Sequence, residues 1–382
     1  MLLEARKLLG MASNSENTGQ TGLQVIQGLC VLVLTCDVLN FFLENQLLLI
    51  MPKVLLLAAL FRSTRSILLL LFSSLLLSSI LIQSFHTHDV NLILMDTAFG
   101  VKAILFFYSL EYFLDKKTIV SDIGVKIVLA FFVFNVLLTW LGIGLTSYGR
   151  LPSGIPIGSK GIYQSGNEFG IAFFFIVALL LHGGTNWVRA ILSAIVGVAI
   201  ATKVALVAVL LIIYHWLKPA LRRHPIFVGL LIVVFSSMVV FPLLLDYIGI
   251  RFASDFSSSS NMVSFLLSGR DLRIVESLNS FAEASTLSVL FGVPFHCVAN
   301  VDCSDLKFVE NDLVDFLLIY GVVTWVVIVS LIGRILLKAW RINQRYFRAL
   351  FFLFGISFLS GHVLYNPLLP IILALAFQRA RS

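Results

Sequence analysis

The chain has 382 residues, of which 59% are hydrophobic and only 12% are charged, and its mean hydropathy is +0.99. A soluble protein of this length cannot bury so much apolar surface in a core, so the composition predicts a polytopic membrane protein. The formal net charge of +7 would suggest nucleic-acid binding in a soluble protein. Here we expect no nucleic acid as a partner, because membrane proteins concentrate Lys and Arg on their cytoplasmic loops.

Apolar runs predict an all-α fold of about twelve transmembrane helices in a single integral membrane domain, residues 1–382. The first twenty residues carry no cleavage site of a signal peptide, so the first helix should direct its own insertion. The pair at 188–217 could instead be one long span and a re-entrant piece. The expected helices lie at 23–42, 47–61, 66–83, 93–113, 124–144, 167–183, 188–201, 203–217, 226–247, 313–337, 348–362 and 363–378.

Basic residues predict the orientation of these helices. With both termini in the cytoplasm, most of the 27 Lys and Arg fall on the cytoplasmic side, among them Lys117, Arg222 and Arg341. Removing one helix from the pair at 188–217 would invert this pattern for everything that follows. The bias therefore supports both helices and a multi-pass membrane protein with both termini in the cytoplasm and membrane lipids around it.

The same alternation leaves two extracytoplasmic loops, a smaller one at 145–166 and a large one at 248–312. A structureless loop as long as the second is unusual unless it is functional. Its second half has the apolar spacing of a helix, so we expect short amphipathic helices over the mouth of the membrane domain.

The four cysteines fall into two pairs. Cys30 and Cys36 lie in the first apolar run, where cysteine usually packs as a small hydrophobic residue. Cys297 and Cys303, in HCVANVDC, lie in the large loop. If that loop faces an oxidising periplasm, these two can form a disulfide, whereas their spacing is not typical of a metal site.

Charged residues at the ends of apolar runs form three clusters, and the first surrounds the smaller loop. Arg150 and Lys160 flank LPSGIPIGSKG, a Gly- and Pro-rich stretch whose backbone can approach a ligand closely. Asn167 and Glu168 open the next helix. The simplest interpretation of these two is a helix cap and a carboxylate favoured by the helix dipole, but it does not explain Lys160 or the glycines.

The second cluster is SGRDLR, in the large loop. A spacing of three would place Arg270 and Arg273 on one face of a helix, and Arg is suited to binding phosphate with two parallel hydrogen bonds. The alternative is a salt bridge to Asp271 or Glu276 on a solvated helix.

The third cluster, VENDLVDFLLIYG, begins a long apolar run. An acidic helix start explains Glu310 and Asp312, but Asp315 lies one turn inside the run, where a carboxylate is costly. The stretch GHVLYNP adds His362 and Tyr365 at an outer turn. Together the clusters place cations and carboxylates at one membrane face, as an anionic lipid-linked substrate requires.

Five stretches together resemble the superfamily of bacterial O-antigen polymerases (Wzy) and O-antigen ligases. They are SKGIYQSGNEFG, ATKVALVAVL, SGRDLR, ENDLVDFLLIYG and GHVLYNP, and their order and spacing cover about residues 145–370. The resemblance implies a class C-like membrane glycosyltransferase of the bacterial inner membrane that works on the periplasmic side. It would move a growing glycan from undecaprenyl diphosphate to a lipid-linked repeat unit, and a chain-length regulator is a candidate partner. Ligases of this superfamily usually carry a histidine where this chain reads Glu310-Asn311-Asp312, which favours a polymerase.

The charged residues suit that chemistry. The leaving diphosphate can be stabilised by Arg150, Lys160, Arg270 and Arg273. Because arginine can take the place of a metal there, no metal or other cofactor is expected. The acceptor hydroxyl needs a general base, for which the candidates are Glu310, then Asp312, then His362. The other expected substrate-binding residues are Asn167, Glu168, Asp315 and Tyr365.

Two other classes of function compete with this interpretation. A flippase of lipid-linked sugars would also bury charges, but near the midplane and in repeated halves. It would gain support if Asp315 and Lys203 both faced one central aqueous path. A structural partner in a polysaccharide export complex would need no acid–base residues.

Overall fold

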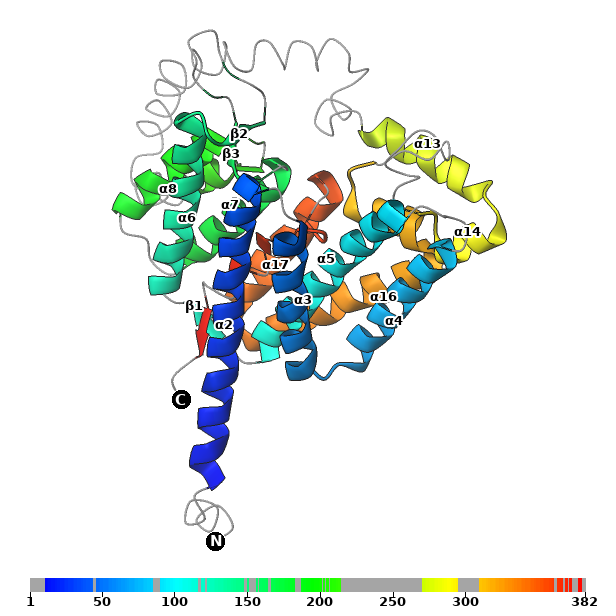
Figure 1. The fold of residues 1–382 in the computed structure, drawn as a ribbon, viewed down its shortest axis with the longest axis horizontal. Coiled ribbons are helices and arrows are strands. Elements are labelled where there is room, and N and C mark those ends of the chain that lie inside the picture. The colour runs from blue at the N-terminus through cyan, green and yellow to red at the C-terminus, as the bar shows by residue number, and fades with distance from the viewer. Residues whose placement is uncertain are drawn as a thin grey trace, which may run out of the picture.

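The computed structural model describes residues 11–43, 46–84, 90–115, 118–120, 122–147, 150, 156, 158–163, 166–182, 187–200, 202, 204–205, 207–213, 270–294, 309–360, 363–366, 368–369, 371–372 and 377–379. Helices dominate this part of the chain (Figure 1). They are α2 (Met11–Leu43), α3 (Gln46–Ser63), α4 (Ile67–Ser84), α5 (Val90–Asp115), α6 (Asp122–Trp140), α7 (Gly166–His182), α8 (Trp187–Ile200), α13 (Arg270–Ala282), α14 (Thr286–Phe291), α16 (Asp312–Ile342) and α17 (Gln344–Ser360). The strands are β1 (Thr118–Val120), β2 (Leu145–Thr146), β3 (Ser159–Gly161) and β4 (Phe377–Arg379).

Several described helices are suited to a membrane. Long enough and apolar enough to cross one are Leu23–Leu43, Ile67–Ser84, Leu92–Asp115 and Asp312–Ile342. Shorter apolar helices are Gly124–Trp140, Glu168–Ala178, Val188–Ile200 and Tyr346–Ser357. Large apolar side chains face outward on these helices, for example Ile67 and Leu81 on α4, as expected where lipid is the solvent. The prediction of an all-α membrane protein is confirmed, whereas the count of twelve spans stays a prediction; the expected span 226–247 lies outside the described residues.

The expected helix 363–378 is wrong at both of its described ends. Residues 363–366 form a turn, and Phe377 and Gln378 belong to β4, which pairs antiparallel with β1. Between these ends, residues 368–369 and 371–372 are helical, as predicted. Asn366 stays in the turn because the residue before a proline disfavours helical geometry. In the smaller loop, β2 and β3 pair as an antiparallel hairpin, which was not predicted from the sequence.

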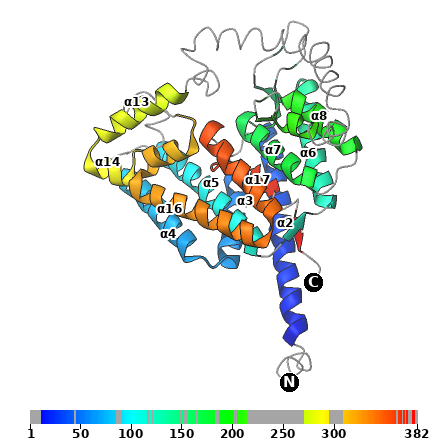
Figure 2. The ribbon, with the colours of Figure 1, turned by 180° about the vertical axis from the view of Figure 1, so that it is seen from behind.

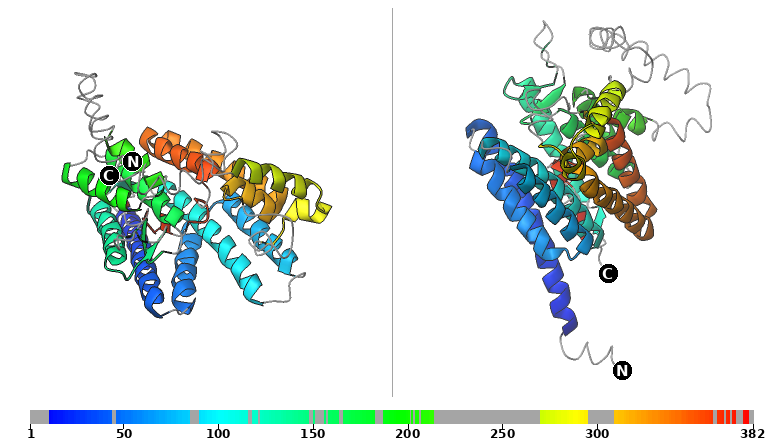
Figure 3. Two further views of the ribbon diagram at one scale, coloured as in Figure 1. Left: turned by 90° about the horizontal axis from the view of Figure 1, so that it is seen from above. Right: turned by 90° about the vertical axis from the view of Figure 1, so that its right-hand side faces the viewer.

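The described elements lie in two layers and have two distinct ends. Helices α2, α3, α5 and α4 lie side by side in one layer, and α16 and α17 form a second layer across from them (Figure 3). The start of α2 and the β1–β4 pair lie at one end, whereas α13 and the β2–β3 hairpin lie at the other (Figures 1 and 2). This separation agrees with the predicted alternation of loops, and which end faces the cytoplasm stays a prediction.

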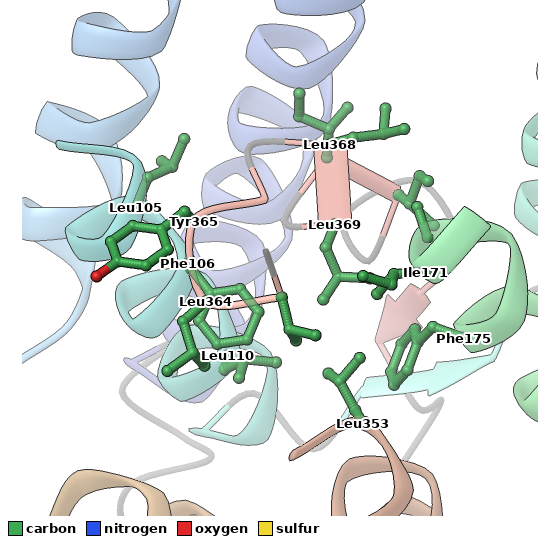
Figure 4. Packing of buried hydrophobic residues seen from close by; sticks show 14 of the residues in the cluster. Leu105, Phe106, Leu110, Ile171, Phe175, Leu353, Leu364, Tyr365, Leu368 and Leu369 are labelled. Carbon is green, nitrogen blue, oxygen red and sulfur yellow. The ribbon is translucent and has the colours of Figure 1, made fainter. Parts of the chain in front are cut away.

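The core is centred on α5, whose residues 103–114 are all buried. Leu105, Phe106 and Leu110 of α5 pack near Leu364 and Tyr365, while Ile171 and Phe175 of α7 and Leu353 of α17 surround Leu369 (Figure 4). The turn after α17 is therefore held inside the bundle, close to the start of α16.

Candidate functional site

The second and third charge clusters meet in an ion pair at the end of the bundle that carries α13. Arg270, the first residue of α13, places Nη2 2.6 Å from Oε2 of Glu310, which lies just before α16. The Arg270 side chain is 13% exposed and that of Glu310 is 38% exposed. The pair is therefore partly desolvated but accessible, as groups that must meet a substrate need to be.

Glu310 has an unusual backbone conformation. Its φ of 61° makes it the one non-glycine residue with positive φ in the described part of the chain. Such a conformation costs about 1–3 kcal/mol and persists only where the surroundings enforce it. The enforcing group is the carboxylate of Asp315, whose two oxygens accept the backbone N–H groups of Val309 and Asn311, each at 2.9 Å. Asp315 thus fixes both neighbours of Glu310.

Asp312 holds a different part of the structure. Its side chain is fully buried, and Oδ2 accepts hydrogen bonds from Ser357 Oγ at 2.9 Å, Val363 N at 2.7 Å and Leu364 N at 2.9 Å. The carboxylate therefore ties the turn of GHVLYNP to the start of α16. Neither Asp312 nor Asp315 shares the exposed position of Glu310.

Helix α16 is broken inside its apolar run. Gly321 has φ 73° and ψ 174°, which interrupts the helical hydrogen bonds. The carbonyl of Leu318 accepts from Val293 N at 2.8 Å, and the carbonyl of Ile319 accepts from Gln83 Nε2 at 2.7 Å. Backbone groups buried at membrane depth must be satisfied within the protein, so these donors make the break tolerable. Gln83 was not among the predicted site residues, and its one signal in the sequence was an amide near the end of an apolar run.

Two glycines let the loop helix α14 lie directly against this break. A Cβ on Gly321 would come within 2.2 Å of Leu290 O, and one on Gly292 would come within 2.1 Å of Ile319 O. The carbonyl of Phe291 also accepts hydrogen bonds from Gln83 Nε2, at 3.1 Å, and from Ser79 Oγ of α4. The segment that carries Arg270 is therefore anchored to the helix that Glu310 precedes.

The first charge cluster lies elsewhere at this end of the molecule. Arg150 Nη2 donates to the carbonyl of Thr139, in the last turn of α6, at 2.9 Å. Lys160 lies on β3, where burial lowers the pKa of its ammonium group. The hairpin and α13 lie on opposite sides of the bundle (Figures 1 and 2). Arg150 and Lys160 are thus not brought to the Arg270–Glu310 pair.

The remaining site candidates have varied positions. Arg273 is exposed on α13, so the two arginines that were expected to act together differ in their surroundings. Tyr365 is buried and stacks between Phe99 and Phe316, with ring centroids 3.7 Å and 4.4 Å apart. Asn167 and Glu168 lie in the first turn of α7, and the carbonyl of Glu168 accepts from Asn366 Nδ2 at 2.8 Å.

Several predictions fall on parts of the chain that the structure does not describe. His362 and Lys203 are outside the described residues, and so are Cys297 and Cys303 with their expected disulfide. Cys30 and Cys36 are free and buried in α2, which confirms their role in packing.

Compared with known proteins, the chain matches no family model, no curated protein and no solved structure. Function must therefore be inferred from the chemistry of the site. A guanidinium can bind phosphate oxygens, and an accessible carboxylate can take a proton. Their meeting at one end of an apolar bundle suits a reaction on a lipid-linked anion.

Proposed function

We propose that the chain is a polysaccharide polymerase, for O-antigen (lipopolysaccharide) or exopolysaccharide, of the bacterial inner membrane. It transfers a growing glycan from undecaprenyl diphosphate to a lipid-linked repeat unit at the periplasmic face, and both termini lie in the cytoplasm. The observation that carries this proposal is the Arg270–Glu310 pair, with Glu310 accessible and held in a strained conformation. The order of the five motifs supports the same assignment.

Each member of the pair has a separate task in the transfer. The acceptor hydroxyl loses its proton to the Glu310 carboxylate as its oxygen forms the new glycosidic bond. The bond between the sugar carbon and the diphosphate breaks, and the diphosphate leaves with the electron pair. Positive charge develops on the sugar carbon and negative charge on the leaving oxygens. Arg270 stabilises those oxygens through its planar fork of N–H donors.

The resting ion pair gives a simple order of events. A diphosphate that binds Arg270 competes with Glu310 for the same guanidinium N–H group. Glu310 then exchanges its arginine partner for the acceptor hydroxyl. The base therefore becomes available when the donor is in place, which limits wasteful transfer to water.

The buried carboxylates act as positioning residues in this proposal. Asp315 fixes the backbone on both sides of Glu310, and Asp312 fixes the turn at residues 363–366, after α17. Arg150 and Lys160 lie apart from the pair, and Arg273 is exposed one turn after Arg270. All three make outer contacts to the lipid-linked substrates.

The alternatives are less well supported. A flippase would place Asp315 on a central aqueous path, but this carboxylate is fully buried and accepts two backbone N–H groups. An O-antigen ligase, which transfers glycan to the lipid A core, would be expected to carry a histidine in place of the Glu310-Asn311-Asp312 sequence.

The glycan pattern of a strain that lacks the chain tests the proposal. We expect lipid-linked products with a single repeat unit and no ladder of bands with increasing numbers of repeat units. The intact gene should restore this glycan ladder. Long chains that remain on the undecaprenyl carrier would instead identify a ligase. Repeat units trapped at the cytoplasmic face would identify a flippase.

A further inference from the structure

A second group of charged residues lies inside the bundle, and the reaction described above does not use it. Lys53 of α3 donates from Nζ to Oδ1 of Asp37 of α2 at 2.6 Å, and these side chains are only 13% and 10% exposed. Lys102 of α5 interacts electrostatically with Asp37, and both lysines interact with Glu168 of α7. Four helices therefore each contribute one charged residue to a common region, although ionisable groups are costly within apolar helices.

Lys102 is the least explained member of this group. It lies well inside the apolar helix Leu92–Asp115 and is half-buried. Within the described ranges it forms no hydrogen bond or ion pair, although it is attracted by the carboxylates of Asp37 and Glu168. An ammonium group has three N–H donors and no acceptor. A partly buried ammonium of this kind points to a polar ligand.

Tyr163, between β3 and α7, brings a second donor to the same region. Its ring stacks on Phe169 at 5.7 Å and meets the edge of Phe131 at 6.0 Å, so its orientation is fixed. Its hydroxyl is buried and has no hydrogen-bond partner in the described part of the chain. The phenol interacts electrostatically with Asp37 and Glu168, and burial raises its pKa well above the usual value. The hydroxyl therefore stays protonated and can donate.

The charge balance of the group indicates the class of ligand. Among the described residues of this group, the formal charges of Lys53 and Lys102 balance those of Asp37 and Glu168, so these four residues give a second phosphate no net attraction. Donors and carboxylate acceptors are instead mixed within one region. Sugar hydroxyls need both, because each donates one hydrogen bond and accepts others. A neutral oligosaccharide therefore fits this group better than an anion does.

We propose that Lys102, Tyr163, Asp37 and Glu168 form a carbohydrate-binding subsite, a proposal that rests on the polymerase function and names the part of the substrate bound there. The subsite lies between the hairpin side of the bundle and the start of α16. Glu168 interacts electrostatically with Asp312, which follows Glu310 by two residues, and its carbonyl is held by Asn366. The glycan of a lipid-linked substrate thus extends from Arg270 and Glu310 into the bundle.

A purely structural ion-pair network would explain Lys53 and Asp37, but it would not require Tyr163. Tyr163→Phe removes one buried hydroxyl and keeps the stacked ring, so the fold should be unaffected. Tyr320→Phe is the matched control, because Tyr320 of α16 is also a buried tyrosine whose hydroxyl has no partner among the described residues. Lys102→Met removes the ammonium group at nearly constant length.

The test is a binding measurement on the purified full-length protein in lipid nanodiscs. One probe is the oligosaccharide released by mild acid from the surface glycan of the wild-type host, and the other is inorganic diphosphate. We expect Tyr163→Phe to weaken oligosaccharide binding about threefold to tenfold and Lys102→Met about tenfold or more, since the second loses a charge-assisted bond. Tyr320→Phe should bind like the wild type, and diphosphate binding should be unchanged in all three variants.

Two results would overturn the subsite. One is unchanged oligosaccharide binding in both Tyr163→Phe and Lys102→Met. The other is that these variants lose diphosphate binding instead of oligosaccharide binding. The polymerase function is tested independently, by the glycan ladder of the deletion strain. Oligosaccharide binding that depends on Tyr163, in a chain whose deletion leaves the ladder intact, would keep the subsite and reject the polymerase.

Discussion

Arg270 and Glu310 lie forty residues apart in the chain, yet their side chains meet at 2.6 Å. Arg270 begins a loop helix, and Glu310 precedes a long apolar helix. The contact of α14 with the break in α16 brings these segments together through backbone atoms. The pair is therefore set by the architecture as well as by its own attraction, which is modest for partly exposed groups.

Substitutions at Arg270 separate charge from geometry. Arg270→Lys keeps the positive charge but loses the fork that binds two phosphate oxygens, and Arg270→Ala loses both. We expect Lys to retain a small part of polymer formation and Ala essentially none, with normal protein levels in the membrane. Because Arg270 acts on the leaving group, the transfer rate should fall more than the affinity for the donor lipid. A normal ladder in Arg270→Ala would remove Arg270 from the reaction.

Asp315→Asn should disturb the backbone around Glu310 and leave the Glu310 side chain itself unchanged. The amide that replaces the carboxylate has one acceptor oxygen, so the N–H of Val309 or Asn311 loses its partner at a cost of about 1–3 kcal/mol. We expect a lower unfolding temperature in detergent and a large loss of polymer. Glu276→Gln, an exposed change on α13, is the control and should leave both unchanged. Full polymer formation in Asp315→Asn would contradict the positioning role.

Gly321→Ala tests the break in α16. An added Cβ would meet Leu290 O at 2.2 Å, and the backbone φ of 73° disfavours any side chain. We expect α14 to separate from α16, with loss of folded protein in size-exclusion profiles. Gly333→Ala, in the same helix with nothing within 4 Å of the new Cβ, should be neutral or slightly stabilising. Equal behaviour of the two variants would argue that the break does not anchor the loop.

The orientation in the membrane can be measured with reporter fusions. Fusions at Lys117, Arg222 and Arg341 should report the cytoplasm, and fusions at Ser258 and Asn366 should report the periplasm. The reason is the excess of basic residues on one set of loops. A cytoplasmic result at Ser258 would be incompatible with twelve spans and with a periplasmic active site.

The helical membrane architecture could be predicted from sequence because apolar runs alone specify it. Long runs such as 66–83 correspond closely to a described helix, α4. The strand pair β1–β4 could not be predicted, because three-residue strands far apart in the chain leave no periodic pattern. The break at Gly321 was also missed, since a glycine in an apolar run does not reveal that another segment packs against it.

Part of the candidate site could also be predicted from the sequence. Glu310 was a candidate because it stands at the start of an apolar run, and Arg270 because it is one of two arginines at helical spacing in the large loop. The structure brings these two residues together. The roles of Asp312 and Asp315 could not be predicted, because the sequence does not distinguish a buried carboxylate that accepts backbone N–H groups from any other acidic residue. Lys102 could not be recognised as part of a site from the sequence, since the carboxylates that attract it come from α2 and α7.

Glu310→Gln is the measurement that tests the proposed reaction most directly. The substitution preserves the size of the side chain and its ability to accept a hydrogen bond from Arg270, but an amide cannot take the acceptor proton. In a transfer assay with purified protein and lipid-linked repeat units, we expect donor binding to survive while the transfer rate falls by roughly a hundredfold or more. A transfer rate equal to that of the wild type, at equal protein abundance, would show that Glu310 is not the base and would contradict the proposed site.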